Sequence, residues 1–197
     1  RQRQDVYKRQ GSIVGTSSLR RQSQLKARFP HLKVETLRGN LQTRLRKLDE
    51  GQYDGIILAA AGLIRLQLGD RIRQLISTDD SIPAVGQGAL GIEINAQRQD
   101  LLEVLAPLND ATTHACVAAE RAFSRALAGS CTVPLGAYAN SADAQTIHIQ
   151  GFVAALDGST VLKNQLVGQL SQAEQLGASL AQALIAQGAR EVLNDYQ

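Results

Sequence analysis

The residue best suited to covalent chemistry in this sequence is Cys131, one of two cysteines in the 197-residue chain. It follows Gly129, where an expected helix ends, and precedes Pro134, where an expected strand begins, so we expect it on a loop. Loops are largely exposed, and an exposed thiol is available for reaction. The alternative, a half-buried loop cysteine without a role, stays open. No histidine lies in a companion motif, so the chemistry of a cysteine protease is not indicated.

Arginines form the second group of candidate residues, because they recur at three successive turns between a strand and a helix. The turns are "GTSSLRR", "LRGNLQTR" and "AAAGLIR", and their arginines are Arg20, Arg21, Arg38, Arg44 and Arg65. In open α/β sheets, ligands bind outside the carboxyl ends of the strands, where helix N-termini favour negative charge. Guanidinium groups bind carboxylates and phosphates through paired hydrogen bonds. The pattern predicts one anion-binding cleft formed by three loops; the alternative is ordinary solvated charge on helix surfaces.

Composition and motif spacing argue against several other classes of function. The net charge is only +3, and aromatic residues make up 4% of the sequence, too few for stacking on nucleic-acid bases. His31, His114 and His148 are scattered, so neither a metal site nor a catalytic triad is predicted. The "GQG" stretch lacks the full spacing of a nucleotide-binding loop. Without a long apolar run or a secretory leader, we expect a cytoplasmic protein with free thiols and no membrane partner.

The elements that must position these residues follow two hydrophobic patterns. From Gly11, short apolar runs alternate with amphipathic stretches, which is typical of parallel α/β units. Strands are expected at 12–15, 32–37 and 54–58, each leading into a helix, the second of which Asn40 caps and Gly51 ends.

A connecting region should then hold a strand at 89–94 and a helix ended by Pro107. A long helix from Asp110 or Thr112 follows, in which Cys116 should be a small buried hydrophobe. Alternating strands at 133–140, 147–156 and 160–168 suggest an antiparallel sheet covered by helices. The fold class is therefore α/β, with a second, small α+β domain at the C-terminus.

Long stretches of the sequence resemble the porphobilinogen deaminase (hydroxymethylbilane synthase) family. They include "GSIVGTSSLRRQSQL", "LRGNLQTRLRKLDEGQYDGIILAAAGL", "IPAVGQGALGIE" and "AERAFSRALAGSCTVPLGAY", in the family's order. The resemblance implies a periplasmic-binding-protein-like α/β domain at 11–84, a returning segment of a first domain at 85–108 and a cofactor-carrying domain at 109–197. Residues 1–10 have no counterpart in this pattern and are interpreted as a non-native leader.

The resemblance also implies a transferase of tetrapyrrole (haem) biosynthesis. Such an enzyme joins four porphobilinogen molecules, with loss of ammonia, on a dipyrromethane cofactor attached to Cys131 through a thioether. It implies a monomer whose substrate is a small molecule, and not a nucleic-acid or membrane partner. The residues that would contact the cofactor, besides Cys131, are Ser18, Arg20, Arg21, Arg38, Gly39, Arg44, Ala59, Gly62 and Gln87. Those that would contact the substrate are Arg38, Asn40, Arg44 and Arg65.

One departure from the family's pattern limits the expected activity. The family has a long N-terminal segment that carries a catalytic aspartate, and residues 1–10 stand in its place here. No catalytic residue is therefore assigned, and we expect the chain to be inactive on its own, with 85–108 as its least stable region. The alternative function is a sensor or binding module for small anions, which would have no use for a tethered dipyrrole.

Overall fold

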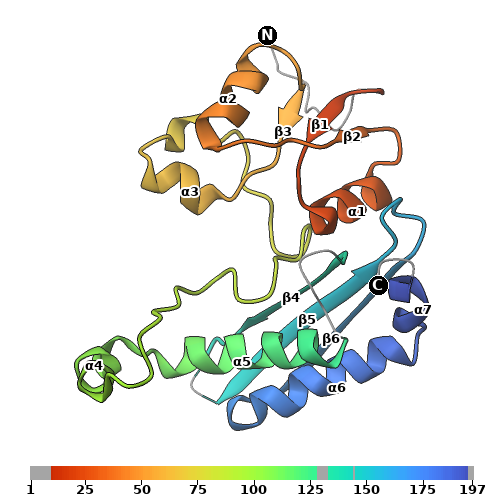
Figure 1. Cartoon of the computed structure of the whole chain (residues 1–197). Coiled ribbons are helices and arrows are strands. Elements are labelled where there is room, and N and C mark those ends of the chain that lie inside the picture. The colour runs from red at the N-terminus through yellow and green to blue at the C-terminus, as the bar shows by residue number, and fades with distance from the viewer. Residues whose placement is uncertain (1–9, 128–132, 144, 195–197) are drawn as a thin grey trace.

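A computed structural model describes residues 10–127, 133–143 and 145–194 of the chain. Two bodies follow each other along the sequence, a small upper lobe and a larger C-terminal domain, joined by an extended connection (Figure 1).

The upper lobe is built on a parallel sheet of three short strands in the order β2-β1-β3. The strands are β1 (Ile13–Gly15), β2 (Lys33–Glu35) and β3 (Gly55–Ile56), and the helices that follow them are α1 (Leu19–Arg28), α2 (Leu41–Asp49) and α3 (Ala60–Arg65). Val14, Leu25 and Leu32 form the buried core between the sheet and α1. The parallel strand-helix alternation predicted from the sequence is confirmed, although each strand is shorter than expected.

Helices α1 and α2 begin at polar side chains that accept from their first turns, whereas α3 begins at Ala59 without a side-chain cap. The Ser18 hydroxyl accepts from Arg21 N at 3.4 Å, and the Asn40 side chain accepts from Thr43 N at 2.8 Å. Each bond satisfies a backbone N–H that has no partner within its own helix. After α2, Gly51 takes a positive φ of 76°, as expected for the residue that ends the helix.

The connection from residue 66 to residue 110 contains only short helical elements. They are η2 (Gly69–Arg71), α4 (Gln99–Leu105) and η3 (Ala106–Leu108). The strand predicted at 89–94 is wrong: these residues form no strand, and Leu90 and Ile92 are 85% and 59% exposed. A strand needs a hydrogen-bonded neighbour, and no described segment pairs with this one.

The C-terminal domain is an antiparallel sheet in the order β4-β5-β6 with helices on one face (Figure 1). The strands are β4 (Leu135–Asn140), β5 (Thr146–Ala154) and β6 (Val161–Gln169), and the helical elements are α5 (Ala111–Ala126), η4 (Leu170–Gln172), α6 (Ala173–Ile185) and α7 (Ala189–Asn194). Phe123, Ile147 and Leu180 are among its buried core residues. The small antiparallel sheet, the helix from Asp110 and the burial of Cys116 are confirmed.

Candidate anion-binding site

The three turns that carry arginines meet at one edge of the parallel sheet. Thr16, which follows β1, donates its N–H to Glu35 O of β2 and accepts from Leu37 N. On the other side of β1, Ile57 N donates to Gly15 O. These bonds hold the carboxyl ends of β1, β2 and β3 next to each other, which is the ligand-binding edge of an open α/β sheet.

Arg21 is close enough to both Arg20 and Arg44 at this edge for their charges to repel its own. Burial, and then the charge of Arg21, lowers the pKa of Arg20 to about 10. Burial, and then the charge of Arg44, also lowers the pKa of Arg21. Among the described residues, no acidic side chain forms an ion pair with any of the three. No acidic side chain among the described residues therefore compensates their positive charge, which is an arrangement suited to an anionic ligand.

Backbone carbonyls, and not carboxylates, orient these three guanidinium groups. Arg21 Nη1 donates to Ile57 O at 3.2 Å, and Arg44 Nε donates to Gly39 O at 2.8 Å. Arg20 is only 7% exposed, and its Nη1 donates to Ile82 O in the connection. Because each neutral carbonyl uses only part of a guanidinium, donors remain for carboxylate oxygens.

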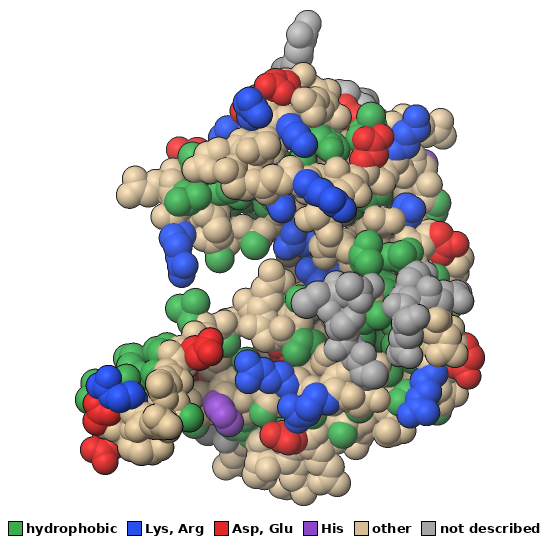
Figure 2. Space-filling model, in the orientation of Figure 1, with side chains coloured by type: hydrophobic (Ala, Val, Ile, Leu, Met, Phe, Trp, Pro, Cys, Tyr) green, Lys and Arg blue, Asp and Glu red, His purple; other side chains and the backbone are tan. Residues whose placement is uncertain are grey.

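The other predicted contact residues have less defined positions relative to this cluster. Arg38, Ala59, Gly62 and Arg65 are exposed, and no hydrogen bond or ion pair among the described residues ties the Arg38 or Arg65 side chain to the cluster. Gln87 lies in the connection, where its side chain accepts from Ala84 N at 3.3 Å. In the space-filling view, Lys and Arg side chains lie on the upper wall of a hollow between the lobe and the C-terminal domain (Figure 2).

Comparison with known proteins shows the family of the chain. Residues 2–103 match the family model described as "Porphobilinogen deaminase, dipyromethane cofactor binding domain", and residues 114–186 match the model of the family's C-terminal domain. The chain belongs to the porphobilinogen deaminase family. The arginine cluster lies within the match to the cofactor-binding domain, and this match confirms the expected dipyrromethane cofactor.

Curated proteins called porphobilinogen deaminase show the same similarity. The chain is 67% identical over 183 residues to the protein of Methylobacillus flagellatus, 59% identical over 184 residues to that of Thiobacillus denitrificans and 57% identical over 184 residues to that of Laribacter hongkongensis. Each alignment covers 93% of this chain but only 59–60% of the relative. The chain thus spans about three-fifths of the length of these relatives.

The two cysteines of this family member differ in what the structure shows of them. Cys131 lies outside the described residues, so its expected place on a loop stays a prediction. Cys116 is buried on α5, and burial, followed by the charges of Glu120 and Asp110, raises its pKa. A thiol with a raised pKa is a poor nucleophile at neutral pH, which agrees with the structural role predicted for Cys116.

Two polar residues that the sequence analysis did not single out hold the connection in place. Gln24 on α1 binds the backbone of Ile82, and Glu120 on α5 binds Gly86 N. Glu120 is 4% exposed. A signal for it exists in the sequence, since it is an acidic residue within the apolar stretch "CVAAERAF", one helical turn after the buried Cys116.

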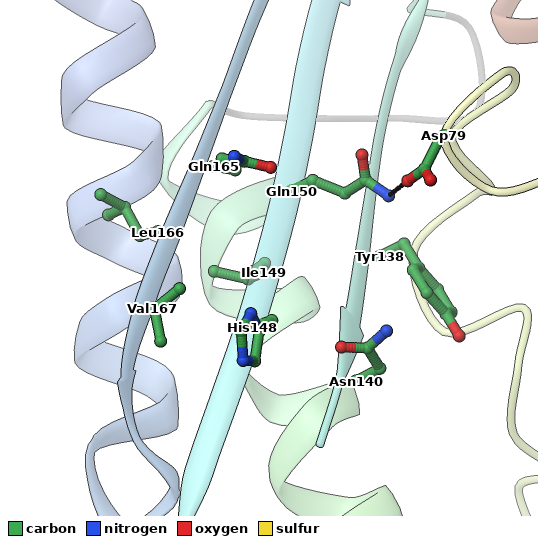
Figure 3. Close-up of a pocket in the computed structure, with 9 residues that line it drawn as sticks. All are labelled: Asp79, Tyr138, Asn140, His148, Ile149, Gln150, Gln165, Leu166 and Val167. Atoms are coloured by element: carbon green, nitrogen blue, oxygen red, sulfur yellow. Dashed lines mark hydrogen bonds between the residues drawn. The ribbon is translucent and has the colours of Figure 1, made fainter. Parts of the chain in front are cut away.

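The open face of the antiparallel sheet carries a further hollow of about 200 Å³. It is lined by uncharged polar groups from all three strands, among them Tyr138, Asn140 and Gln165, and by His148 and Asp79 (Figure 3). Gln150 donates to the Asp79 carboxylate at 3.1 Å and so ties the connection to the sheet. With a carboxylate at its rim, this hollow is not suited to an anion.

Within the described ranges, no helix is long and apolar enough to cross a membrane. The same residues contain no group of three or more His, Cys, Asp or Glu side chains placed to hold a metal ion.

Proposed function

We propose that this chain forms the cofactor-holding and C-terminal parts of a hydroxymethylbilane synthase. The observation that carries the proposal is the uncompensated cluster of Arg20, Arg21 and Arg44 at the carboxyl edge of the parallel sheet. Membership of the family and the match to its cofactor-binding domain support it.

The residues of this edge fit a dipyrromethane. Each pyrrole ring of such a cofactor carries an acetate and a propionate, so it presents several carboxylates to the protein. Among the described residues, Arg21 and Arg44 each donate to one backbone carbonyl and have no acidic partner, and they would bind these carboxylates in pairs of hydrogen bonds. Helices α1 and α2 would add favourable dipoles at their N-termini.

The bound cofactor would supply the primer to which four porphobilinogen units are joined, each with loss of ammonia, before hydrolysis releases a linear tetrapyrrole. Cys131 would anchor this primer through its sulfur, while Cys116 stays buried. Ser18, Arg38, Gly39, Asn40, Ala59, Gly62, Arg65 and Gln87 are proposed as further cofactor or substrate contacts. No residue of this chain is assigned as the catalytic acid, so we propose that the chain is inactive alone. We further propose a cytoplasmic monomer.

The arginine cluster is tested by measuring the binding of porphobilinogen to the chain by calorimetry. Because Arg21 donates charged hydrogen bonds, Arg21→Leu should raise the Kd at least about tenfold. Arg190→Leu is the matched control, since Arg190 is an exposed arginine on α7. Unchanged binding in Arg21→Leu, or an equal loss in Arg190→Leu, would refute the assignment.

A further inference from the structure

The Glu120 carboxylate joins two segments that are far apart in the sequence. Its Oε2 accepts from Gly86 N in the connection at 2.6 Å, and its Oε1 accepts from Ala139 N on β4 at 2.9 Å. β4 is an edge strand, so its outward N–H groups have no strand partner on that side. Glu120 therefore satisfies one N–H of the sheet edge and one N–H of the connection with a single buried group.

Four residues earlier, the connection is held by the upper lobe. Gln24 of α1 accepts from Ile82 N at 2.7 Å and donates to Ile82 O at 3.2 Å, and Arg20 donates to the same carbonyl. The Ile82 side chain, 1% exposed, packs on the sheet of the C-terminal domain beside Phe152. Gly136 of β4 allows a close approach, because a Cβ there would lie 2.4 Å from Pro83 O.

The segment Ile82–Gly86 is thus fixed at one end to the helix that carries Arg20 and Arg21, and at the other end to α5 and β4. We propose that Glu120 is a positioning residue, which seats this segment on the C-terminal domain and thereby sets the orientation of α1 and its arginines against the sheet. This inference rests on the proposed function only where it gives the arginines a ligand. The contacts of Glu120 with Gly86 and Ala139 do not depend on that function.

A carboxylate suits this place better than an amide of the same shape. Two N–H groups point at the side chain from different segments, so both of its terminal atoms must accept. Glutamine offers one acceptor and would turn its NH₂ toward a second donor. Glu120→Gln should therefore release one of the two segments while leaving the volume of the side chain unchanged.

Amide hydrogen exchange of the whole chain, read residue by residue by NMR without any ligand, tests this inference. In the wild type, the Gly86 and Ile82 amides should be protected, although they lie in a segment without regular secondary structure. In Glu120→Gln, the exchange of Gly86 or Ala139, together with Ile82, should become at least about tenfold faster, while α6 amides change little. Glu191→Gln, which alters an exposed glutamate on α7, should leave all of these rates unchanged.

Three results would overturn the inference. They are fast exchange of Gly86 in the wild type, unchanged exchange at Gly86, Ala139 and Ile82 in Glu120→Gln, and an equal rise at every amide of the variant, which would indicate only a less stable fold. The wild-type measurement stands even if Glu120→Gln does not fold. Because no porphobilinogen is present, failure here is distinct from failure of the proposed function.

Discussion

Arg20 and Arg21 are neighbours in the sequence, yet their side chains differ in burial and in hydrogen-bond partner. Arg20 is buried against the connection and bonds Ile82 O, whereas Arg21 is partly exposed and bonds Ile57 O within the lobe. Both have pKa values lowered by burial and by neighbouring arginines, so both charges oppose folding when no anion is bound. Groups that bind ligands often cost stability in this way.

Arg21→Leu should therefore leave the free energy of unfolding unchanged or raise it, even though it weakens porphobilinogen binding. Removing Arg21 relieves its repulsion with Arg20 and Arg44. Urea denaturation in the absence of ligand measures this, with Arg190→Leu as the control. A loss of more than about 1 kcal/mol would show that Arg21 is a structural residue and not one held for a ligand.

Glu120 should give the chain a defined pH dependence. Burial raises its pKa in the folded chain, against two hydrogen bonds from Ala139 and Gly86 that lower it. The folded chain then binds this proton more readily than the unfolded chain, so the ionised carboxylate costs stability above the folded pKa. That cost disappears as the pH falls below the unfolded value.

We therefore expect the free energy of unfolding of the wild type to rise relative to that of Glu120→Gln between neutral pH and about 4.5. Hydrogen bonds lower the pKa values of Asp80, Asp110 and Asp143, so the contribution of these carboxylates to the stability of the fold is lost in acid. Because these aspartates are present in both proteins, their contribution cancels in the difference. Burial, and then the charge of Glu120, raises the pKa of Cys116, so this thiol stays protonated between neutral pH and pH 4.5 and adds nothing to the difference. A difference that stays constant or falls in acid would contradict the assignment.

Among the elements, the hairpin between β5 and β6 packs closely on the backbone of the upper lobe. A Cβ on Gly158 would lie 2.4 Å from Ala27 N and 2.8 Å from Lys26 C, both in the backbone of α1. Gly158 also has a φ of 76°, which L-residues rarely adopt. The sheet and α1 thus touch without an intervening side chain at this position.

Gly158→Ala should lower the free energy of unfolding more than Gly51→Ala does. Gly51 has the same φ of 76°, but a Cβ there meets nothing within 4 Å. Gly51→Ala therefore carries only the backbone cost of about 1–2 kcal/mol. The clash with α1 should add about 1–3 kcal/mol in Gly158→Ala. Chemical denaturation of both variants measures the difference, and equal losses would mean that the hairpin is not tightly packed on α1.

The elements also show how far the sequence predicts this fold. Caps depend on the few residues that follow them, so the start at Asn40 was predicted correctly, and Asp110 is one of the two starts expected for the long helix. The prediction of a strand at 89–94 was wrong, because alternation of apolar and polar residues does not by itself supply a neighbouring strand to pair with. The arginine turns were predicted to meet, since parallel strands bring their carboxyl ends to one edge, and Arg20, Arg21 and Arg44 do. The bonds of Glu120 to residues 86 and 139 depend on tertiary packing alone.

At the scale of the whole molecule, stability is unevenly distributed along the chain. The C-terminal domain has a continuous buried core, whereas the connection exposes a series of large apolar side chains. These are Leu75, Leu90, Ile92, Leu102, Val104 and Leu108, each more than half exposed. The middle of the connection, Ile82–Gly86, differs from these exposed parts because Gln24 and Glu120 bind its backbone.

Residues 89–108 should consequently exchange their amide hydrogens fastest among the described residues between the two bodies. Few buried contacts oppose local opening there, and α4 has no buried residue. Exchange followed by mass spectrometry on peptides measures this, with β5 and α6 as the internal reference. The sequence predicts 85–108 as the least stable region, and within it Gly86 is expected to be protected because its N–H donates to Glu120. Protection of 89–108 equal to that of the C-terminal domain would contradict the prediction.

The central claim is that this chain holds a dipyrrole on Cys131 beside an arginine-lined edge. The most direct test is the intact mass of the chain after incubation with the linear tetrapyrrole product. The Cys131 thiol can displace the terminal hydroxyl of this product as water, a step that needs no deamination of porphobilinogen. We expect the mass of the tetrapyrrole less one water on the wild type and on Cys116→Ser, and no such addition on Cys131→Ser. An adduct that survives Cys131→Ser, or no adduct on the wild type, would contradict the claim.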